Sequence, residues 1–272
     1  GSTPHVMSMA SRRLPAMRVV GWNVMQGGGL RAGRITAALV TVDAEVVVVS
    51  EHRASAPLSR MLAEHGWVHQ VGLPDPAGGY AAVLVASRRP LREVEPHYGG
   101  GGCGQRWVNV EVVGSGWVIA GALIPGFHRE HPLRKKHFWD FVVSDFAPAL
   151  ADRPTLLIGD LNTGLHGIDE KGATLRCAED MAALRKAGWV DVWHNLHPGE
   201  RPPPTWWDPS KGNGFRLDHA FLSPSSPAAI EIDYPSHIDG VPTTRGGSPK
   251  AVGETPPLSD HVPVVVDLAS LG

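Results

Sequence analysis

The stretch Thr155–Thr163, TLLIGDLNT, joins a short apolar run to two polar side chains. The run up to Ile158 is short and apolar, which favours a buried β-strand. Asp160 and Asn162 follow it, two residues apart. Because a rigid sheet holds the loops at its strand ends, side chains at such positions are well placed for binding or catalysis. The stretch therefore predicts a sheet protein with a functional site at the end of a strand.

Runs of the same kind recur along the whole chain. Predicted strands are Met17–Asn23, Val46–Ser50, Tyr80–Ala86, Trp107–Val113, Trp117–Ile124, Phe215–Leu222, Ile230–Ile232 and Val262–Leu268. Helical composition or spacing predicts helices over Arg31–Val40, His131–Phe146 and Ala178–Ala187. Since strands outnumber the interspersed helices, we expect an α/β sandwich of two packed sheets with helices outside. A doubly wound dinucleotide fold is disfavoured, because the glycines at 27–29 lack the GxGxxG spacing.

Two segments are predicted to be loops. The glycine-rich residues 99–104 would weaken any regular element. The Pro/Gly/Ser/Thr-rich residues 235–257 exceed a routine turn, and loops of that length are usually functional. We expect this second loop to affect substrate choice more than stability. Residues 1–16 are expected to be an expression remnant or a disordered N-terminus, and residues 17–270 a single catalytic domain.

The composition is that of an ordinary globular protein, with 42% hydrophobic and 19% charged residues in 272. The net charge of −2 gives no general attraction to nucleic acid, so a site for a polyanion has to be local. Cys103 and Cys177 are expected to be packing residues. No apolar run approaches the roughly 18 residues that span a bilayer. We therefore expect a cytoplasmic monomer without membrane contact.

Polar side chains also stand at the ends of the other predicted strands. They are Asn23, Glu51, Asp218, Asp260 and His261. The hard oxygens of Asn23, Glu51 and Asp260 suit Mg²⁺ or Mn²⁺ rather than zinc. A histidine beside a carboxylate can act as a general base or hold a phosphate, a role worth about 10²–10⁴-fold in rate. Each of these residues alone would be read as a turn, a helix cap or a surface acid. Their recurrence at strand ends predicts phosphate-ester hydrolysis.

The ordered motifs resemble those of the endonuclease/exonuclease/phosphatase superfamily. They are Trp22-Asn23-Val24, Ser50-Glu51, Gly159-Asp-Leu-Asn162, Arg216-Leu-Asp-His219 and Ser259-Asp-His261. The resemblance implies a four-layer αββα sandwich of two mixed sheets, with the active site at the mouth between them. It implies that Glu51, Asn23 and Asp260 hold the metal, and that Asp160 orients or deprotonates the attacking water. Asn162 would hold the phosphate, and Asp218 would pair with His261.

Within the superfamily, the motifs are closest to the exonuclease III and abasic-site (AP) endonuclease branch. Ile124-Pro125 followed by a basic helix, and Trp206 and Phe215 before the Leu-Asp motif, carry this likeness. It implies that Trp206 and Phe215 line a pocket for a flipped, baseless sugar. Read from the residues alone, they could equally be core aromatics. Four basic residues could contact DNA phosphates or form a solvated helix face: Arg129, Arg134, Lys135 and Lys136.

The chain departs from that branch at two positions, where Leu123 replaces the usual tyrosine and Met25 the usual acid. Nor does it carry the Asn-Thr-His segment typical of the sphingomyelinase and pancreatic deoxyribonuclease branches. We expect an Mg²⁺- or Mn²⁺-dependent phosphodiesterase that acts on DNA, as an AP endonuclease, a 3′-exonuclease or both. The alternatives are a phosphodiesterase or phosphatase for a small-molecule or lipid ester on the same scaffold, and a catalytically silent nucleic-acid-binding relative.

Overall fold

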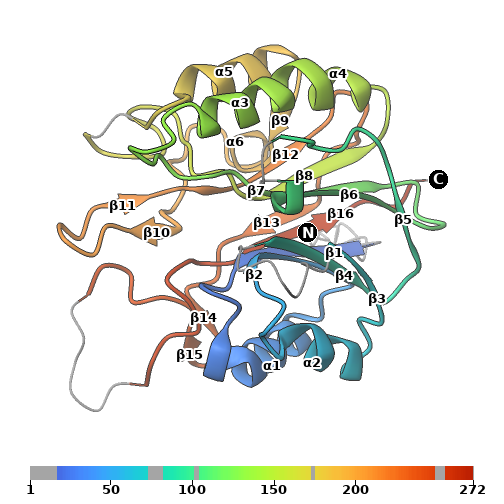
Figure 1. Ribbon diagram of the computed structural model, residues 1–272, viewed down its shortest axis with the longest axis vertical. Helices are drawn as coiled ribbons and strands as arrows, with labels where there is room; N and C mark the ends of the chain where they lie inside the picture. The colour runs from blue at the N-terminus through green and yellow to red at the C-terminus, as the bar shows by residue number, and fades with distance from the viewer. Residues whose placement is uncertain (1–16, 73–81, 101–103, 173–174, 249–254, 272) are drawn as a thin grey trace, which may run out of the picture.

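The chain folds into two six-stranded β-sheets packed face to face, with helices on both outer faces (Figure 1). The computed structural model describes residues 17–72, 82–100, 104–172, 175–248 and 255–271. The four layers confirm the predicted αββα sandwich. The predictions for residues 1–16, for Cys103 and for parts of the 99–104 and 235–257 loops lie outside the described residues.

The first sheet has the strand order β13-β16-β1-β2-β4-β3. Its strands are β1 (Met17–Asn23), β2 (Val46–His52), β3 (His69–Val71), β4 (Ala82–Ser87), β13 (Glu231–Asp233) and β16 (Val264–Leu268). β1 runs parallel to β2 and antiparallel to β16. The ends of β1 and β2 therefore share one edge of the sheet with the start of β16.

The second sheet has the order β5-β6-β7-β8-β12-β9. Its strands are β5 (Leu91–Glu93), β6 (Trp107–Val112), β7 (Val118–Leu123), β8 (Thr155–Asp160), β9 (Val190–Asp191) and β12 (Asp218–Leu222). β8 is parallel to β7 and antiparallel to β12, and the register pairs Asp160 with Asp218. The end of β8 thus lies beside the start of β12.

Helices cover the outer face of each sheet (Figure 1). α1 (Ala32–Val42) and α2 (Leu58–Glu64) lie on the first sheet, after the short η1 (Gly29–Arg31). The second sheet carries α3 (Arg134–Phe141), the π-helical turn η3 (Val142–Phe146), α4 (Ala147–Ala149) and α5 (Ala178–Lys186). The predicted helix over His131–Phe146 therefore begins three residues later and changes its winding at Val142. The remaining short helices are η2 (Gly104–Arg106) and α6 (Val192–Leu196).

Three hydrophobic cores separate the four layers. The central core lies between the sheets and includes Val48, Val85, Ile119, Ile158 and Val264. A second core joins the β6–β8 face to α3 and α5, and a third joins the β1–β2 face to α1 and α2. Strands buried on both faces explain the unbroken apolar runs of the sequence. No helix in the described part of the chain is long and apolar enough to cross a membrane.

Two short hairpins extend from the same side of the sandwich (Figure 1). They are β10 (Trp206–Trp207) with β11 (Gly214–Phe215), and β14 (His237–Ile238) with β15 (Val241–Pro242). The predicted strand over Phe215–Leu222 is therefore divided between β11 and β12. The second hairpin lies within the 235–257 loop, which is thus partly regular. Each strand of these hairpins has only two residues, which is too short for a periodic sequence pattern to predict it.

The sheets approach each other closely where β1 crosses β8. A Cβ atom on Gly21 would lie 2.7 Å from Cγ1 of Ile158. At the next residue, Gly159, φ is +143°, and a Cβ atom would lie 2.1 Å from the Ala122 carbonyl oxygen. Gly21 therefore lets β1 approach β8 of the other sheet, while Gly159 lets β8 lie close to its neighbour β7 within the second sheet.

We predict that Gly21→Val lowers the free energy of unfolding by about 2 kcal/mol or more, because overpacking forces Ile158 or the sheets to move. Urea denaturation followed by circular dichroism measures this. Gly33→Ala on α1 is the matched control, since a Cβ atom there meets nothing within 4 Å. It should stabilise the helix by roughly 0.5–1 kcal/mol. Equal stability of the Gly21→Val variant and the wild type would contradict the close sheet contact.

Candidate active site

The strand ends bring the predicted polar residues together at one end of the sandwich. Asn23 ends β1, and Glu51 lies near the end of the parallel neighbour β2. Asp160 ends β8, and Asp218, its register partner, begins β12. The side chains of Asn23, Asp160 and Asp218 are buried, and that of Glu51 is half-buried. The sheet topology therefore assembles one site from four separate segments.

Asp160 is the centre of the hydrogen-bond network in this site. Its Oδ2 accepts from Nδ2 of Asn23 at 3.0 Å and from Nδ2 of Asn162 at 3.1 Å. Its Oδ1 accepts from the backbone N–H of Asn162 at 2.9 Å. The Asn23 amide also donates to Oε1 of Glu51 at 3.3 Å. Asn162 further donates to the Ile124 carbonyl, so both hydrogens of its amide are engaged.

Asp218 and His261 form the predicted acid–histidine pair, with 2.7 Å between Oδ2 and Nδ1. Burial opposes a charge on His261, yet the carboxylates of Asp218, Asp160 and Asp260 raise its pKa well above the usual range. Burial, with a contribution from Asp218, raises the pKa of Asp160. The site is therefore a buried group of coupled acids around one imidazole.

Strained backbone shapes the Glu51 side of the site. Glu51 has φ of 58°, and the register of β2 against β4 shifts between Val49 and His52, as in a β-bulge. Its Oε2 accepts from the backbone N–H of Gln26 at 2.8 Å. A left-handed conformation in a non-glycine residue persists only where the surroundings enforce it, and such residues concentrate at functional sites. The bulge turns Glu51 toward Asn23.

The site has the donors that a divalent cation requires. Ligand atoms of Asp160, Asp218 and His261 all lie within 4.8 Å of one another. Oδ1 of Asp218 is buried and, among the described residues, has no hydrogen-bond partner. A buried carboxylate oxygen without a partner is costly unless a cation or a donor satisfies it. With Glu51 joined through Asn23, this set of hard oxygens and one imidazole fits Mg²⁺ or Mn²⁺.

Asp260 differs in its surroundings from Asn23 and Glu51, the other predicted metal ligands. Its side chain is exposed and accepts a hydrogen bond from the Ser259 hydroxyl at 3.3 Å. Within the described chain, no hydrogen bond joins its carboxylate to Glu51 or Asn23. Instead, Asp260 lines a neighbouring cavity. A role in metal binding for Asp260 stays a prediction.

The predicted aromatic pair lies beside the acid–histidine pair. Trp206 and Phe215 face each other across the β10–β11 hairpin, with ring centroids 5.9 Å apart. The Trp206 ring centroid is 6.5 Å from that of His261, and the two residues form a β-bridge. Trp206 is half-buried, whereas Phe215 is 9% exposed. Their position is consistent with either a sugar pocket or a core contact.

The four predicted basic residues do not form one exposed face. Arg129 is exposed and Arg134 is half-buried. Lys136 forms ion pairs with Asp140 and Asp180. The interpretation of Lys135 as a surface contact to phosphate is wrong: its side chain is buried and its Nζ donates to the Asn162 carbonyl at 2.5 Å. Helical periodicity turns Lys135 inward while its neighbours face outward.

A buried ion network behind Asp218 was not predicted from the sequence. Arg216 is 1% exposed, and it donates to Asp169 at 2.7 Å and to Asp191 at 2.6 Å. Although burial opposes ionisation, His194 and Arg216 hold the pKa of Asp191 well below its usual range. The network fixes the segment between β11 and β12, and with it Asp218.

The chain belongs to the Endonuclease/Exonuclease/phosphatase family, whose profile matches residues 20–261. Comparison with curated proteins finds no match. Among solved structures, the 3′ phosphatase NExo from Neisseria, bound to a product DNA hairpin, is similar with 20% identity and a TM-score of 0.71, over 93% of this chain and 99% of that one.

Two further structures show the same fold. The AP endonuclease from Archaeoglobus fulgidus has 17% identity and a TM-score of 0.72, over 93% of this chain and 99% of the other. The 3′–5′ exonuclease NExo from Neisseria meningitidis has 19% identity and a TM-score of 0.72, over 93% and 100%. These neighbours confirm the predicted fold.

We predict that Arg216→Met lowers the free energy of unfolding by about 3–5 kcal/mol, because two buried carboxylates lose their cation. Urea denaturation at pH 7 measures the change. Arg60→Met is the control, since the Arg60–Glu64 pair is exposed and should contribute less than about 1 kcal/mol. If both variants lost the same stability, the network would not support the Asp218 segment in the way described.

Proposed function

We propose that this protein is a divalent-metal-dependent phosphodiesterase that hydrolyses DNA, as an AP endonuclease, a 3′-exonuclease or both. The observation that carries the proposal is the buried group of Asp160, Asp218 and His261, joined through Asn23 to Glu51. Such a group is expensive to bury unless it serves a function. The family membership supports the same reaction class.

The chain's own residues would divide the reaction between them. Asp218 holds Nδ1 of His261, which leaves the other ring nitrogen to bind a phosphoryl oxygen or to exchange a proton. The Asn23 and Asn162 amides orient the Asp160 carboxylate, which would position the attacking water and accept its proton. For Asn162 to hold the phosphate as well, its amide has to release Ile124 or Asp160.

A divalent cation would be held by Glu51 with members of the buried group. When bound, it supplies charge neutralisation for the phosphoryl oxygens. Glu51 is the half-buried acid of the site, and its position is fixed by the Gln26 N–H and the Asn23 amide. This orientation preorganises the carboxylate without closing it off from solvent.

Three features support DNA as the substrate. Three solved structures with the same fold are nucleases or a DNA 3′ phosphatase. Trp206 and Phe215 stand beside His261, where an extruded sugar could be received. Arg129 and Arg134 lie on the exposed 126–134 segment, whose residue Gly126 approaches Asn162. They could contact the phosphates that flank the scissile bond.

We predict that His261→Ala lowers kcat on DNA by roughly 10²-fold or more, because the acid–histidine pair is lost. End-labelled duplex DNA with and without one abasic site is incubated in Mg²⁺, Mn²⁺ or EDTA. Cutting at the abasic site or stepwise 3′ loss, abolished by EDTA and by the substitution, is the expected result. Trp193→Ala, a substitution in α6 outside the site, is purified in the same way as a control and should keep the activity.

Two results would contradict the proposal. Wild-type protein that cuts neither duplex in either metal would redirect it to small-molecule or lipid phosphate esters. Cutting that survives His261→Ala at the full rate would show a contaminating nuclease or a wrong role for His261. Circular dichroism of the variant establishes that a loss of activity is not a loss of folding.

We predict that Glu51→Gln raises the Mg²⁺ concentration for half-maximal activity about tenfold or more, because a neutral amide replaces an anionic oxygen. The amide can still accept from Gln26, so the backbone should keep its shape. Calorimetric titration with Mn²⁺ in the absence of DNA gives a second readout. Glu64→Gln, which changes an exposed acid on α2, is the control. An unchanged metal titration would remove Glu51 from the metal site.

A further inference from the structure

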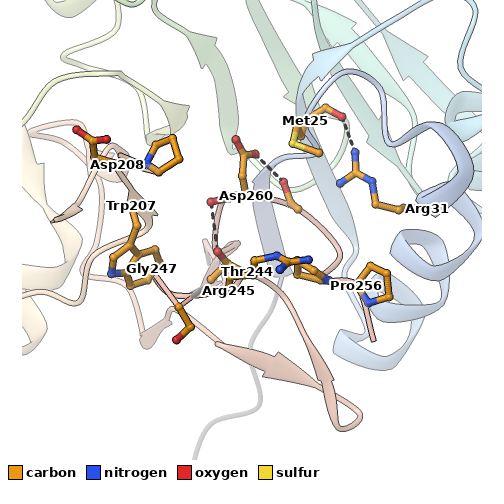
Figure 2. Close-up of a pocket in the computed structure, with 13 residues that line it drawn as sticks. Met25, Arg31, Trp207, Asp208, Thr244, Arg245, Gly247, Pro256 and Asp260 are labelled. Carbon is orange, nitrogen blue, oxygen red and sulfur yellow. Dashed lines mark hydrogen bonds between the residues drawn. The ribbon is translucent and has the colours of Figure 1, made fainter. Parts of the chain in front are cut away.

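A separate cavity of about 570 Å³ lies beside the catalytic group. Ser259 and Asp260, which directly precede His261, form part of its wall, and so does Met25, two residues after Asn23. Figure 2 shows Trp207 and Gly247 on one side of this cavity, Arg31 and Pro256 on the other, and Asp260 between them. Cavities of 300–1,000 Å³ are the size that takes a small ligand.

The walls combine apolar surface with charges of both signs. Trp207 supplies a planar ring, and Pro256 and Pro257 supply further apolar surface. Arg31 and Arg245 supply positive charge, and Asp208 and Asp260 supply negative charge. The Arg31 guanidinium is held in place, since it donates to the carbonyls of Leu258 at 2.5 Å and Met25 at 2.7 Å. A planar ring next to a fixed cation is the combination that recognises a nucleobase joined to a phosphate.

The Trp207 wall is built by a specific backbone contact. Gly247 has φ of +81°, and a Cβ atom there would lie 2.8 Å from Cδ1 of Trp207. Only a glycine lets the backbone of the 244–248 segment lie against the indole in this way. Thr244 anchors the same segment by donating to the Asp260 carbonyl at 3.3 Å. Residues 244–248 therefore contribute to one side of the cavity.

This cavity is distinct from the Trp206–Phe215 pair. Successive side chains of a strand point to opposite faces, and Trp206 and Trp207 are neighbours in β10. The Trp206 ring lies near that of His261, whereas Trp207 lines the cavity with the 244–248 segment. The two tryptophans thus lie on different sides of the β10–β11 hairpin.

We propose that this cavity binds the nucleoside joined to the scissile phosphate, with its base against Trp207 and its phosphate side toward Arg31 and Arg245. The proposal rests on the proposed function, because it assigns the substrate side of the same site. A bare phosphate would leave the apolar rings unused. A lipid chain would place Arg31, Arg245 and Asp260 against hydrocarbon. The bound unit is therefore a nucleoside rather than an acyl glycerol.

The test compares esters with and without a base. The substrates are thymidine 5′-(p-nitrophenyl phosphate), its 3′ isomer and the base-free methyl p-nitrophenyl phosphate. Trp207→Ala should lower kcat/KM for one thymidine ester about tenfold relative to the base-free ester, the effect of losing one base–aromatic stack. The loss should lie in KM rather than in kcat. Trp207→Phe, which keeps a ring, should recover most of the preference.

A second variant guards against misfolding of the Trp207 substitutions. Ser248→Trp adds an indole from the exposed 248 position and removes no packing. It should fill the cavity and lower the same preference about tenfold. Trp193→Ala is the matched control, because Trp193 is a half-buried indole that stacks on His197 outside the cavity. Its preference for the thymidine ester should equal that of the wild type.

Binding without turnover separates this proposal from the proposed function. Calorimetry in EDTA with the dinucleotide d(TpT) should show binding that Trp207→Ala weakens about tenfold. Such binding in a protein that hydrolyses no ester would uphold the nucleoside site and overturn the phosphodiesterase. If the protein hydrolyses all the esters, and neither Trp207→Ala nor Ser248→Trp alters its preference for a thymidine ester over the base-free ester, the phosphodiesterase is upheld and the nucleoside site is overturned. Binding of glycerophosphoinositol, but not d(TpT), through Trp207 would also overturn the nucleoside site.

Discussion

The hydrogen bond from the Asn23 amide to the Asp160 carboxylate joins two different sheets, and the rest of the site depends on it. It forms where β1 crosses β8, because Gly21 has no side chain and leaves room there for the Ile158 side chain. Behind this contact, the central core is filled by small branched residues of both sheets. Packing that is close throughout holds the strand ends at a constant separation. Catalytic geometry is therefore a consequence of how the two sheets pack.

Burying several acids together costs stability, and residues outside the catalytic group have to offset that cost. Among the described residues, one oxygen of Asp218 has no hydrogen-bond partner, and the Arg216 network helps to hold the segment that carries it. Glu51 keeps a left-handed backbone in a β-bulge. Both features cost stability locally, and the dense sheet core offsets them. Such local cost is expected where side chains are oriented for chemistry rather than for packing.

The catalytic residues and the candidate substrate contacts come from different parts of the fold. Strand ends of the two central sheets supply the acids, and His261 comes just before β16. The β10–β11 hairpin supplies the aromatic surfaces of Trp206, Trp207 and Phe215, and residues 244–248 line the cavity beside Trp207. Loops on a rigid scaffold change without disturbing the core beneath them. Of the two positions that depart from the branch it resembles, Met25 lies in the turn after β1, whereas Leu123 ends the buried strand β7.

The sequence alone determined the layered α/β fold and most of the site, because apolar runs and the polar residues that end them are local patterns. β1, β2 and β8 were predicted to within two residues, and so were the polar ends that the sheets bring together. Only the tertiary structure decided that Lys135 is buried, that Asp260 faces a separate cavity, and that Arg216 pairs with Asp169 and Asp191. Those outcomes depend on contacts between residues 20 or more positions apart, and no local pattern encodes which distant side chain a charge will meet.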